Sequence, residues 1–159
     1  MVLCQELGKI GLLISKKYLN ILVTFCHIFS IIYIKGKINM ATRSNIGIKN
    51  SDGSIEMIYC HWNGYPEFQL PILTGHYNTE DKVRELLALG DISILAERVK
   101  PNEDEKHSFD NPINNVVVAY HRDRGERLNL ATKYQDLDNA LRHKQEYMYI
   151  FEDNKWNVY

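Results

Sequence analysis

The sequence is poor in cysteine and has no pair of cysteines at the spacing of a disulfide framework. Its 159 residues include three cysteines, and two of them, Cys4 and Cys26, lie in a first segment whose composition differs from the rest. Only Cys60 is left for the remainder of the chain. This distribution argues against a secreted, disulfide-linked protein and is typical of a reducing cytosol.

The sequence also has no glycine-rich phosphate loop, no serine nucleophile elbow and no recognisable pair of catalytic carboxylates. These motifs mark common classes of nucleotide-binding protein and hydrolase. Their absence favours a binding protein over an enzyme. The sequence gives no reason to expect a cofactor or a bound metal.

A large net charge is absent too, but the charge is unevenly distributed. The formal net charge is −1. Residues 1–39 contain five lysines and one glutamate (+4), whereas residues 40–159 contain 14 basic and 19 acidic residues (−5). An acidic folded part weakens the case for electrostatic binding to nucleic acid. The length predicts one domain with a sizeable core.

The first segment contains one long apolar stretch, Tyr18 to Ile34, without a formal charge. As a helix it would span about 25 Å, the short limit for crossing a bilayer. One interpretation is a weak membrane anchor. A signal peptide is disfavoured because Ser30-Ile31-Ile32 is not a small-x-small cleavage site.

The third interpretation is that residues 1–39 are an untranslated upstream extension. The stretch from Lys35 to Asn39 could be encoded by a purine-rich ribosome-binding site and a short spacer, followed by a start codon for Met40. The composition changes at Met40 to that of a globular protein. We therefore predict a single domain over residues 40–159.

That domain begins with a predicted β-hairpin. Asn45–Lys49 alternates apolar and polar residues, Asp52-Gly53 is a strong hairpin turn, and Ser54–Trp62 returns as a second strand. Residues 67–76 contain Pro71 and Gly75 and are predicted to be a loop.

The middle of the chain predicts two helices, a loop and a strand. The first helix is capped at Asn78 or Thr79 and ends at Gly90. A second short helix is expected within residues 91–99, and residues 100–115 form a polar loop. Residues 116–120 are β-branched and predict a buried strand.

The last part predicts a helix capped by Asp136, followed by a hairpin with its turn at Asp153-Asn154. The whole pattern indicates an α+β fold. We expect a mainly antiparallel sheet of about five to six strands, with two to three helices packed largely on one face.

Several short motifs resemble one family of small proteins that bacteriophages and prophages encode. They span nearly all of residues 40–159, and this chain has Asn63 and His121 where the family has Asp and Gly. The resemblance implies a phage setting but no particular activity. The motifs are MATRSNIG from Met40, YCHWNGY from Tyr59, HYN from His76, LGD from Leu89, HSFD from His107 and RDRGE from Arg122.

The first candidate site is the aromatic run at the end of the second strand. Tyr59, Trp62 and Tyr65, beside a Gly-Pro turn, could stack on a base or anchor a protein interface. The competing interpretation is that these rings belong to the core. His61 lies within the same run.

The second candidate is the charged run that follows Tyr120. In an extended segment, Arg122 and Arg124 would point to one side and suit a phosphate or carboxylate. Asp123 and Glu126 could orient them or bind a cation. Alternatively, the run is a solvated turn whose charges pair with one another.

Three further possibilities concern cysteine and histidine. His107 and Asp110 lie in the polar loop and could form a lid or hinge contact, or only a capped turn. Cys60 could pair with His76 or His107 as a nucleophile, although a mid-strand thiol is a poor candidate. No zinc-type spacing joins Cys60 to His61, His76, His107 or His121.

These observations lead to one hypothesis and two alternatives. The leading hypothesis is a non-enzymatic phage accessory protein in the host cytoplasm that binds and modulates a host component. One alternative is a nucleotide sponge, or a metal-dependent phosphohydrolase or nuclease, that uses residues 122–126; the other is a membrane-anchored accessory protein. A homo-oligomer is compatible with each. The candidate binding residues are Tyr59, His61, Trp62, Tyr65, His107, Asp110, Arg122, Asp123, Arg124 and Glu126.

Overall fold

The computed structural model of the protein describes residues 41–159. These residues all belong to the compact unit that spans residues 39–159. The predicted anchor at residues 18–34 lies outside the described part. Within residues 41–159, no helix is both long enough and apolar enough to cross a membrane.

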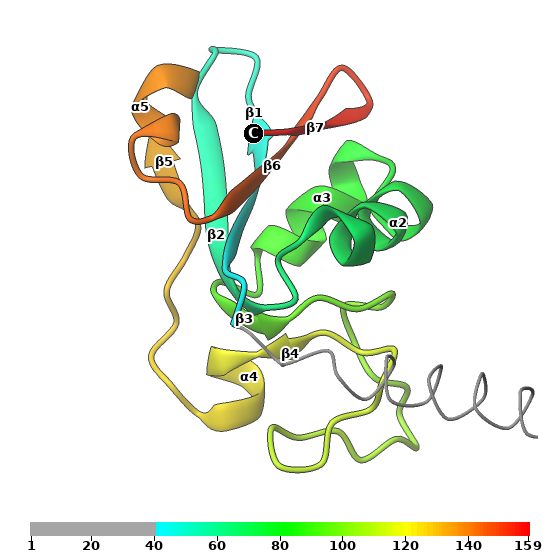
Figure 1. Cartoon of the computed structure of the whole chain (residues 1–159). Coiled ribbons are helices and arrows are strands. Elements are labelled where there is room, and N and C mark those ends of the chain that lie inside the picture. The colour runs from blue at the N-terminus through cyan, green and yellow to red at the C-terminus, as the bar shows by residue number, and fades with distance from the viewer. Residues whose placement is uncertain (1–40) are drawn as a thin grey trace, which may run out of the picture. The chain divides into compact units, whose positions relative to one another are not determined.

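A mixed β-sheet organises the described chain, and its centre is the predicted hairpin (Figure 1). The first strand pairs antiparallel with the second, and on its other side it pairs in parallel with the sixth. The seventh strand pairs antiparallel with the sixth and forms the edge of the sheet on this side. The four strands are β1 (Ser44–Lys49), β2 (Ile55–Trp62), β6 (Tyr147–Glu152) and β7 (Lys155–Val158).

Three short strands extend the other side of the sheet. The end of β2 pairs in parallel with β3, which pairs antiparallel with β4. The start of β2 pairs antiparallel with β5, so β3 and β5 follow one another along the same edge of β2. The three strands are β3 (Ile92–Ile94), β4 (Val118–Ala119) and β5 (Thr132–Tyr134).

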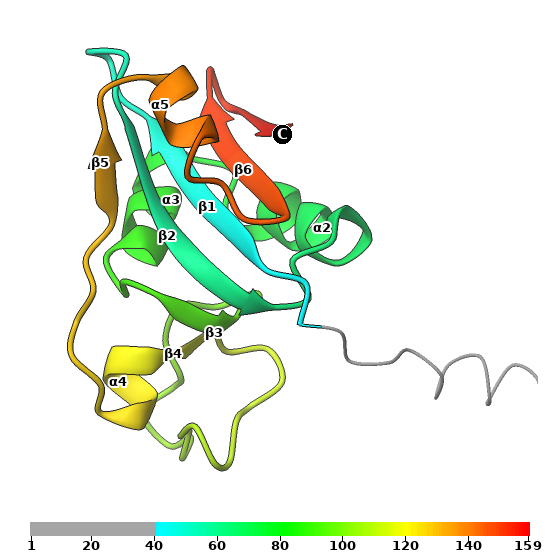
Figure 2. The same cartoon turned by 60° about the vertical axis from the view of Figure 1, so that its left-hand side comes forward.

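Helices lie on both faces of the sheet, as Figures 1 and 2 show from two sides. Two of them, α2 and α3, cover one face, and α5 covers the other. The short helix α4 follows β4 directly at the end of the molecule that also carries the loop of residues 100–115. The bounds are α2 (Pro66–His76), α3 (Glu80–Leu87), α4 (Tyr120–Arg124) and α5 (Leu137–Leu141).

The two faces bury cores of different size. The α2–α3 side holds the larger cluster, in which Ile58 and Tyr149 from the sheet meet Leu73 and Leu86 from the helices. Under α5, a smaller cluster forms around Met57 and Met148 and their neighbours. The alternation of side chains along β2 feeds both clusters, because successive residues of a strand point to opposite faces. Tyr59 and His61 continue the α5 face of β2 past the smaller cluster.

The predicted α+β class and the mainly antiparallel character of the sheet are confirmed, whereas the numbers of strands and helices and the placement of the helices differ from the expectation. The sheet has seven strands, and two of its six pairings are parallel. The described part has four helices, on both faces rather than largely on one. The parallel pairings arise because β3 and β6 each reach their partner by a long crossover containing a helix.

Two local predictions are wrong. Residues 67–76, predicted to be a loop, form most of α2, in which Pro66 occupies a first-turn position and Pro71 lies on the exposed side. Residues 91–99, predicted to hold a short helix, instead form β3 and an irregular segment. The carboxylate of Asp91 does not cap a helix; it accepts a hydrogen bond from the Tyr59 amide of β2 at 2.9 Å.

Candidate binding surface

The fold brings together the two runs that the sequence singled out. The aromatic run ends β2, and the charged run forms α4, which begins at Tyr120. Asp91 joins them, because its side chain accepts from the Tyr59 amide at 2.9 Å and its carbonyl accepts from the Tyr120 amide at 3.2 Å. Two segments about sixty residues apart in sequence therefore share one part of the surface.

Three half-buried rings form a row along the end of β2. The Tyr59 hydroxyl and His61 Nδ1 are 2.8 Å apart, and the two rings meet edge to face at 5.9 Å between centroids. The His61 ring meets Trp62 in the same way at 4.8 Å. These contacts hold the rings in fixed orientations while leaving part of each exposed.

A second aromatic group lies beside this row. The Phe109 ring, from the long loop, stacks on Tyr120 at 6.3 Å, and the Arg124 guanidinium lies 4.8 Å from the Phe109 centroid. Burial raises the pKa of Tyr120; a hydrogen bond with Ser93 lowers it in part, and the neighbouring Tyr59 phenol raises it. We call these six residues, Tyr59, His61, Trp62, Phe109, Tyr120 and Arg124, the aromatic–arginine surface.

The charged run is split between the inside and the outside of the molecule. Arg124 keeps 53% of its side chain exposed and pairs with Glu126 at 3.2 Å. Arg122 points inward, where its Nε donates to Asp123 Oδ1 at 2.6 Å. Its Nη2 donates to Asp123 Oδ2 at 2.7 Å and to the Val117 carbonyl, and Nη1 donates to the Val99 carbonyl at 2.5 Å. The expectation that Arg122 and Arg124 lie on one side assumed an extended segment, whereas this segment is helical.

His107 and Asp123 form a buried pair that fastens the long loop to α4. Their side chains are 1% and 3% exposed, and His107 Nε2 lies 3.3 Å from Asp123 Oδ2. The Ile113 amide donates to His107 Nδ1 at 3.0 Å, so this nitrogen is the acceptor and the proton is on Nε2. The Ala119 amide donates to the same Asp123 oxygen at 2.7 Å.

These contacts fix the charge of Asp123. Burial by itself raises the pKa of this carboxyl, but the hydrogen bonds from Arg122 and Ala119, together with the Arg122 charge, outweigh burial and leave the pKa below its ordinary value. Both carboxylate oxygens already accept hydrogen bonds. A metal at Asp123 or His107 would have to displace them, and residues 41–159 contain no group of three or more Cys, His, Asp or Glu residues suited to a metal ion.

The other candidate residues lie apart from this surface or at its margin. Tyr65 precedes α2, and its ring is 6.0 Å from that of Phe68. Asp110 is exposed in the long loop. His76 ends α2, and His121 Nδ1 contacts the Glu126 carbonyl at 2.7 Å. The fold does not place them together with Cys60.

Cys60 lies in the larger core, under α2. It is fully buried, its thiol contacts the Trp62 carbonyl at 3.6 Å, and Gln69 Nε2 donates to its sulfur at 3.2 Å. Burial raises the pKa of this thiol to about 11, although hydrogen bonds with Ser44 and Gln69 oppose the shift in part. An un-ionised, inaccessible thiol is a poor nucleophile.

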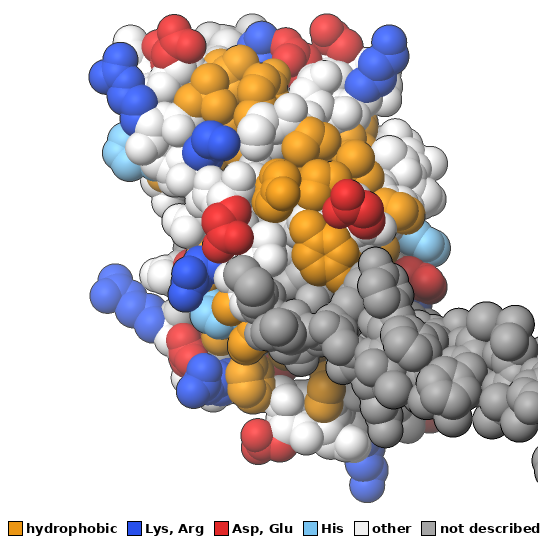
Figure 3. Space-filling view, in the orientation of Figure 1, with side chains coloured by type: hydrophobic (Ala, Val, Ile, Leu, Met, Phe, Trp, Pro, Cys, Tyr) orange, Lys and Arg blue, Asp and Glu red, His pale blue; other side chains and the backbone are white. Residues whose placement is uncertain are grey.

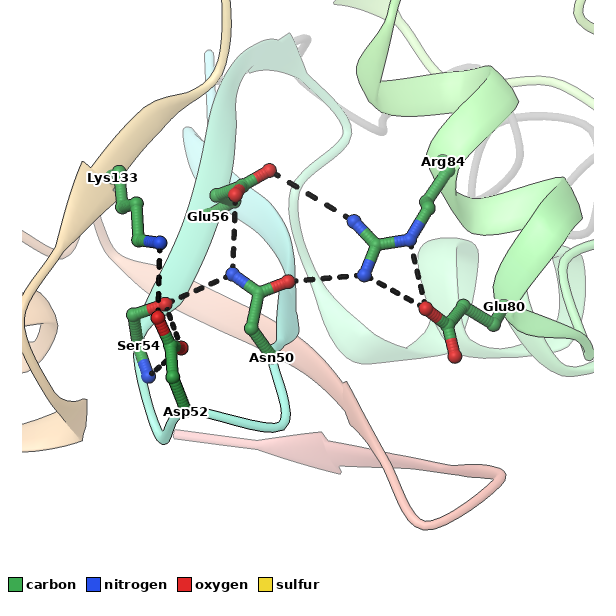
Figure 4. A network of polar contacts seen from close by, with 7 residues as sticks. All are labelled: Asn50, Asp52, Ser54, Glu56, Glu80, Arg84 and Lys133. Carbon is green, nitrogen blue, oxygen red and sulfur yellow. Dashed lines mark hydrogen bonds and ion pairs between the residues drawn. The ribbon is translucent and has the colours of Figure 1, made fainter.

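A second group of polar residues joins the β1–β2 hairpin to α3 and β5 (Figure 4). No pattern in the sequence indicated this group. Arg84 donates to Glu80 at 2.8 Å and to Asn50 at 3.0 Å, and Lys133 pairs with Asp52 at 3.1 Å. The hydrogen bonds from the Ser54 hydroxyl and amide, with help from Lys133, lower the pKa of Asp52 to about 2.

Two hollows flank this polar group. One, of about 460 Å³, lies between the β1–β2 turn, the first turn of α3 and the β6–β7 turn, over Ile48 and Phe151. The other, of about 410 Å³, lies between α3 and β5, over Leu87 and Leu130. The sequence indicated the Asp52-Gly53 turn, but the partners from α3 and β5 are too distant in sequence to be predicted.

Comparisons with known proteins add no relative. No protein-family model, no curated protein and no solved structure matches this chain. The resemblance to phage-encoded proteins therefore stays a prediction.

Proposed function

We propose that this protein is a phage or prophage accessory protein that acts without catalysis, binding and modulating a host component in the bacterial cytoplasm. The contact is made by the aromatic–arginine surface. The phage setting comes from the motif resemblance, and the binding role comes from the chemistry of that surface.

One observation carries the proposal: exposed parts of aromatic rings and an arginine gather where two distant chain segments meet. Tyr, Trp and Arg are the residues that most often dominate the binding energy of protein interfaces. Here they come from β2, the long loop and α4, and their mutual contacts hold them in place. A surface ordered before binding loses less entropy when a partner docks.

Arg122, Asp123 and His107 are held by contacts within the protein, which supports a partner-binding role over the nucleotide alternative. A phosphate site would need a guanidinium free to approach the ligand, but Arg122 is hydrogen-bonded to a carboxylate and two backbone carbonyls. Asp123 and His107 are bonded to one another and to backbone amides. Of the charged run, Arg124 is the cation whose side chain is mostly in solvent.

The test is capture of a partner from bacterial lysate by the tagged chain, read by native mass spectrometry. We expect one host protein in fixed stoichiometry with the wild type, and at least a tenfold weaker affinity, about 1.4 kcal/mol, for Arg124→Ala and Phe109→Ala. Arg142→Ala, an exposed arginine at the end of α5, is the matched control and should bind normally.

Three results would count against the proposal. Retention of the same partner by Arg124→Ala, Phe109→Ala and Trp62→Ala would remove the surface from the contact. Metal-dependent turnover of nucleotides by the purified chain would favour the enzymatic alternative. Peptides from residues 1–39 in a membrane fraction would favour the anchored one.

A further inference from the structure

The strand β7 forms one edge of the sheet. Its register with β6 determines which of its backbone N–H and C=O groups point outward. Met148 and Tyr159 exchange both of their backbone hydrogen bonds, at 3.0 and 2.9 Å. Because bonded and non-bonded pairs alternate in an antiparallel ladder, Asn157 also faces β6, whereas Trp156 and Val158 direct their N–H and C=O groups outward. Within residues 41–159, β7 has no strand neighbour other than β6.

This edge is complementary to itself. If two copies of β7 run antiparallel around a two-fold axis at Asn157, Trp156 of each copy lies opposite Val158 of the other. Each of these pairs can then exchange both of its outward hydrogen bonds. No outward N–H or C=O group of Trp156 or Val158 is left without a partner in this register.

The side chains fit the same register. Trp156 and Val158 share one face of β7, because Phe151 and Tyr149 of β6 lie opposite them. Val158 is 39% exposed, and the dimer would cover it with the half-buried Trp156 ring of the second copy. On the opposite face, Lys155 would meet Tyr159 of the second copy, which is a cation beside an aromatic ring.

The exposed chemistry around β7 agrees with burial in an assembly. Figure 3 shows hydrophobic side chains gathered on the upper half of the face seen in Figure 1, where α5, β6 and β7 lie. A hydrophobic patch beside an unpaired strand is characteristic of an interaction site.

The edge at β5, in contrast, is not complementary to itself. If β5 and the segment before it paired with themselves around Leu130, Arg127 of one copy would lie opposite Lys133 of the other. Like charges directly opposite one another destabilise a strand pair. Edge cations are a common protection against such pairing. Leu130 is nevertheless 67% exposed, so it provides a matched control for Val158.

We infer that the protein forms a homodimer in which two β7 strands pair antiparallel around Asn157 and join the two sheets into one. This assembly leaves the aromatic–arginine surface uninvolved, since that surface is built from β2, α4 and the long loop. The inference is therefore independent of the proposed function.

Analytical ultracentrifugation of the full chain over a dilution series tests the assembly. We expect a dimer for the wild type, a dissociation constant at least tenfold higher for Val158→Lys, and no change for Leu130→Lys. Circular dichroism should show that both variants are folded. A wild-type monomer at every concentration, or a dimer lost in Leu130→Lys and kept in Val158→Lys, would overturn the inference.

A cross-link tests the register. At a non-hydrogen-bonded antiparallel pair the Cα atoms lie about 4.5 Å apart, within the range of a disulfide. Asn157→Cys should therefore give a disulfide-linked dimer on a non-reducing gel, whereas Asn154→Cys at the β6–β7 turn should give no more than the wild type. Equal cross-linking of both variants would contradict the register.

Discussion

At the scale of single residues, Asp123 has the most demanding position. It joins α4, the end of β4 and the long loop through its contacts with Arg122, Ala119 and His107 respectively. Removing its charge would leave a partly buried guanidinium without its carboxylate. The residue therefore supports the part of the molecule that carries Phe109 and Arg124.

We predict that Asp123→Asn lowers the free energy of unfolding by about 2 kcal/mol or more, as for other buried ion pairs that lose one partner. The variant should also flatten the acid dependence of stability. The pKa of Asp123 is lowered in the folded state, so its contribution is complete above the unfolded pKa and is lost as the pH falls through the folded value. Urea unfolding between neutral and acid pH measures both effects.

The control for this prediction is Asp110→Asn, which removes an exposed carboxylate from the same loop. It should unfold like the wild type at every pH. Equal stability of the two variants would show that the buried network contributes little.

The second prediction for a single residue concerns the reactivity of the Cys60 thiol. Because its thiol is fully buried and its pKa is raised to about 11, it should resist alkylation in the native protein near neutral pH. Peptide mass spectrometry after iodoacetamide treatment distinguishes it from Cys4 and Cys26. Denaturant should release the reaction, whereas rapid labelling of native Cys60 would contradict the assignment to the core.

At the scale of elements, two glycines make a matched pair. Gly90 links α3 to β3 with φ at +70°, and a Cβ there would lie 2.2 Å from the Asn129 carbonyl oxygen. Gly75 lies within α2, and no atom would approach its Cβ within 4 Å. The same substitution should therefore have opposite effects at the two positions.

Gly90→Ala should destabilise the protein by more than about 1–2 kcal/mol, the cost of the left-handed conformation alone, because the backbone contact adds to it. Gly75→Ala should stabilise it by up to about 1 kcal/mol by favouring the helix. Thermal unfolding measures both. A stabilised Gly90→Ala variant would mean that the link between α3 and β3 is not formed as described.

The elements also show which features the sequence could predict. The β1–β2 and β6–β7 hairpins and the helices α3 and α5 follow from local signals: the Asp52-Gly53 and Asp153-Asn154 turns, and the Asp136 cap, which accepts from the Asn139 amide at 2.7 Å. Local signals did not predict the secondary structure of α2, which depends on packing against the sheet. Gln69 and Leu73 are fully buried against the sheet, and this burial holds α2 helical despite Pro71.

The candidate site shows the same limit. The sequence identified the residues of both runs, but not which of them face outward. In a strand Arg122 and Arg124 would share a face, whereas in a helix residues two apart are about 200° apart around the axis. The helical turn, which ends at Gly125 with φ at +73°, therefore sends one arginine inward and leaves the other at the surface.

At the scale of the whole molecule, one sheet supports two separate regions, the aromatic–arginine surface and the β7 edge. The centre of the sheet is β1, which pairs along its length with β2 and β6 and is buried at nearly every residue. The aromatic–arginine surface lies at the end of β2, with α4 and the long loop, and the β7 edge lies on the far side of β1. Neither depends directly on the other.

This arrangement predicts an order of hydrogen exchange. The Ile46 amide in β1 should exchange only through global unfolding, because β1 is paired with a strand on each side and Ile46 is fully buried in the core. The Ile113 amide should exchange through local opening of the long loop, since the bond that protects it is the one to His107. Exchange measured against low concentrations of urea separates the two, because global unfolding exposes more surface and depends more steeply on denaturant.

Asp123→Asn then tests whether the loop opens independently of the sheet. It should increase the exchange rate of Ile113 by more than the loss of global stability accounts for, while the rate of Ile46 follows the global change alone. If both amides changed by the same factor, the loop and the sheet would unfold as one unit. The network around Asp123 would then be part of the core rather than a separate support for the aromatic–arginine surface.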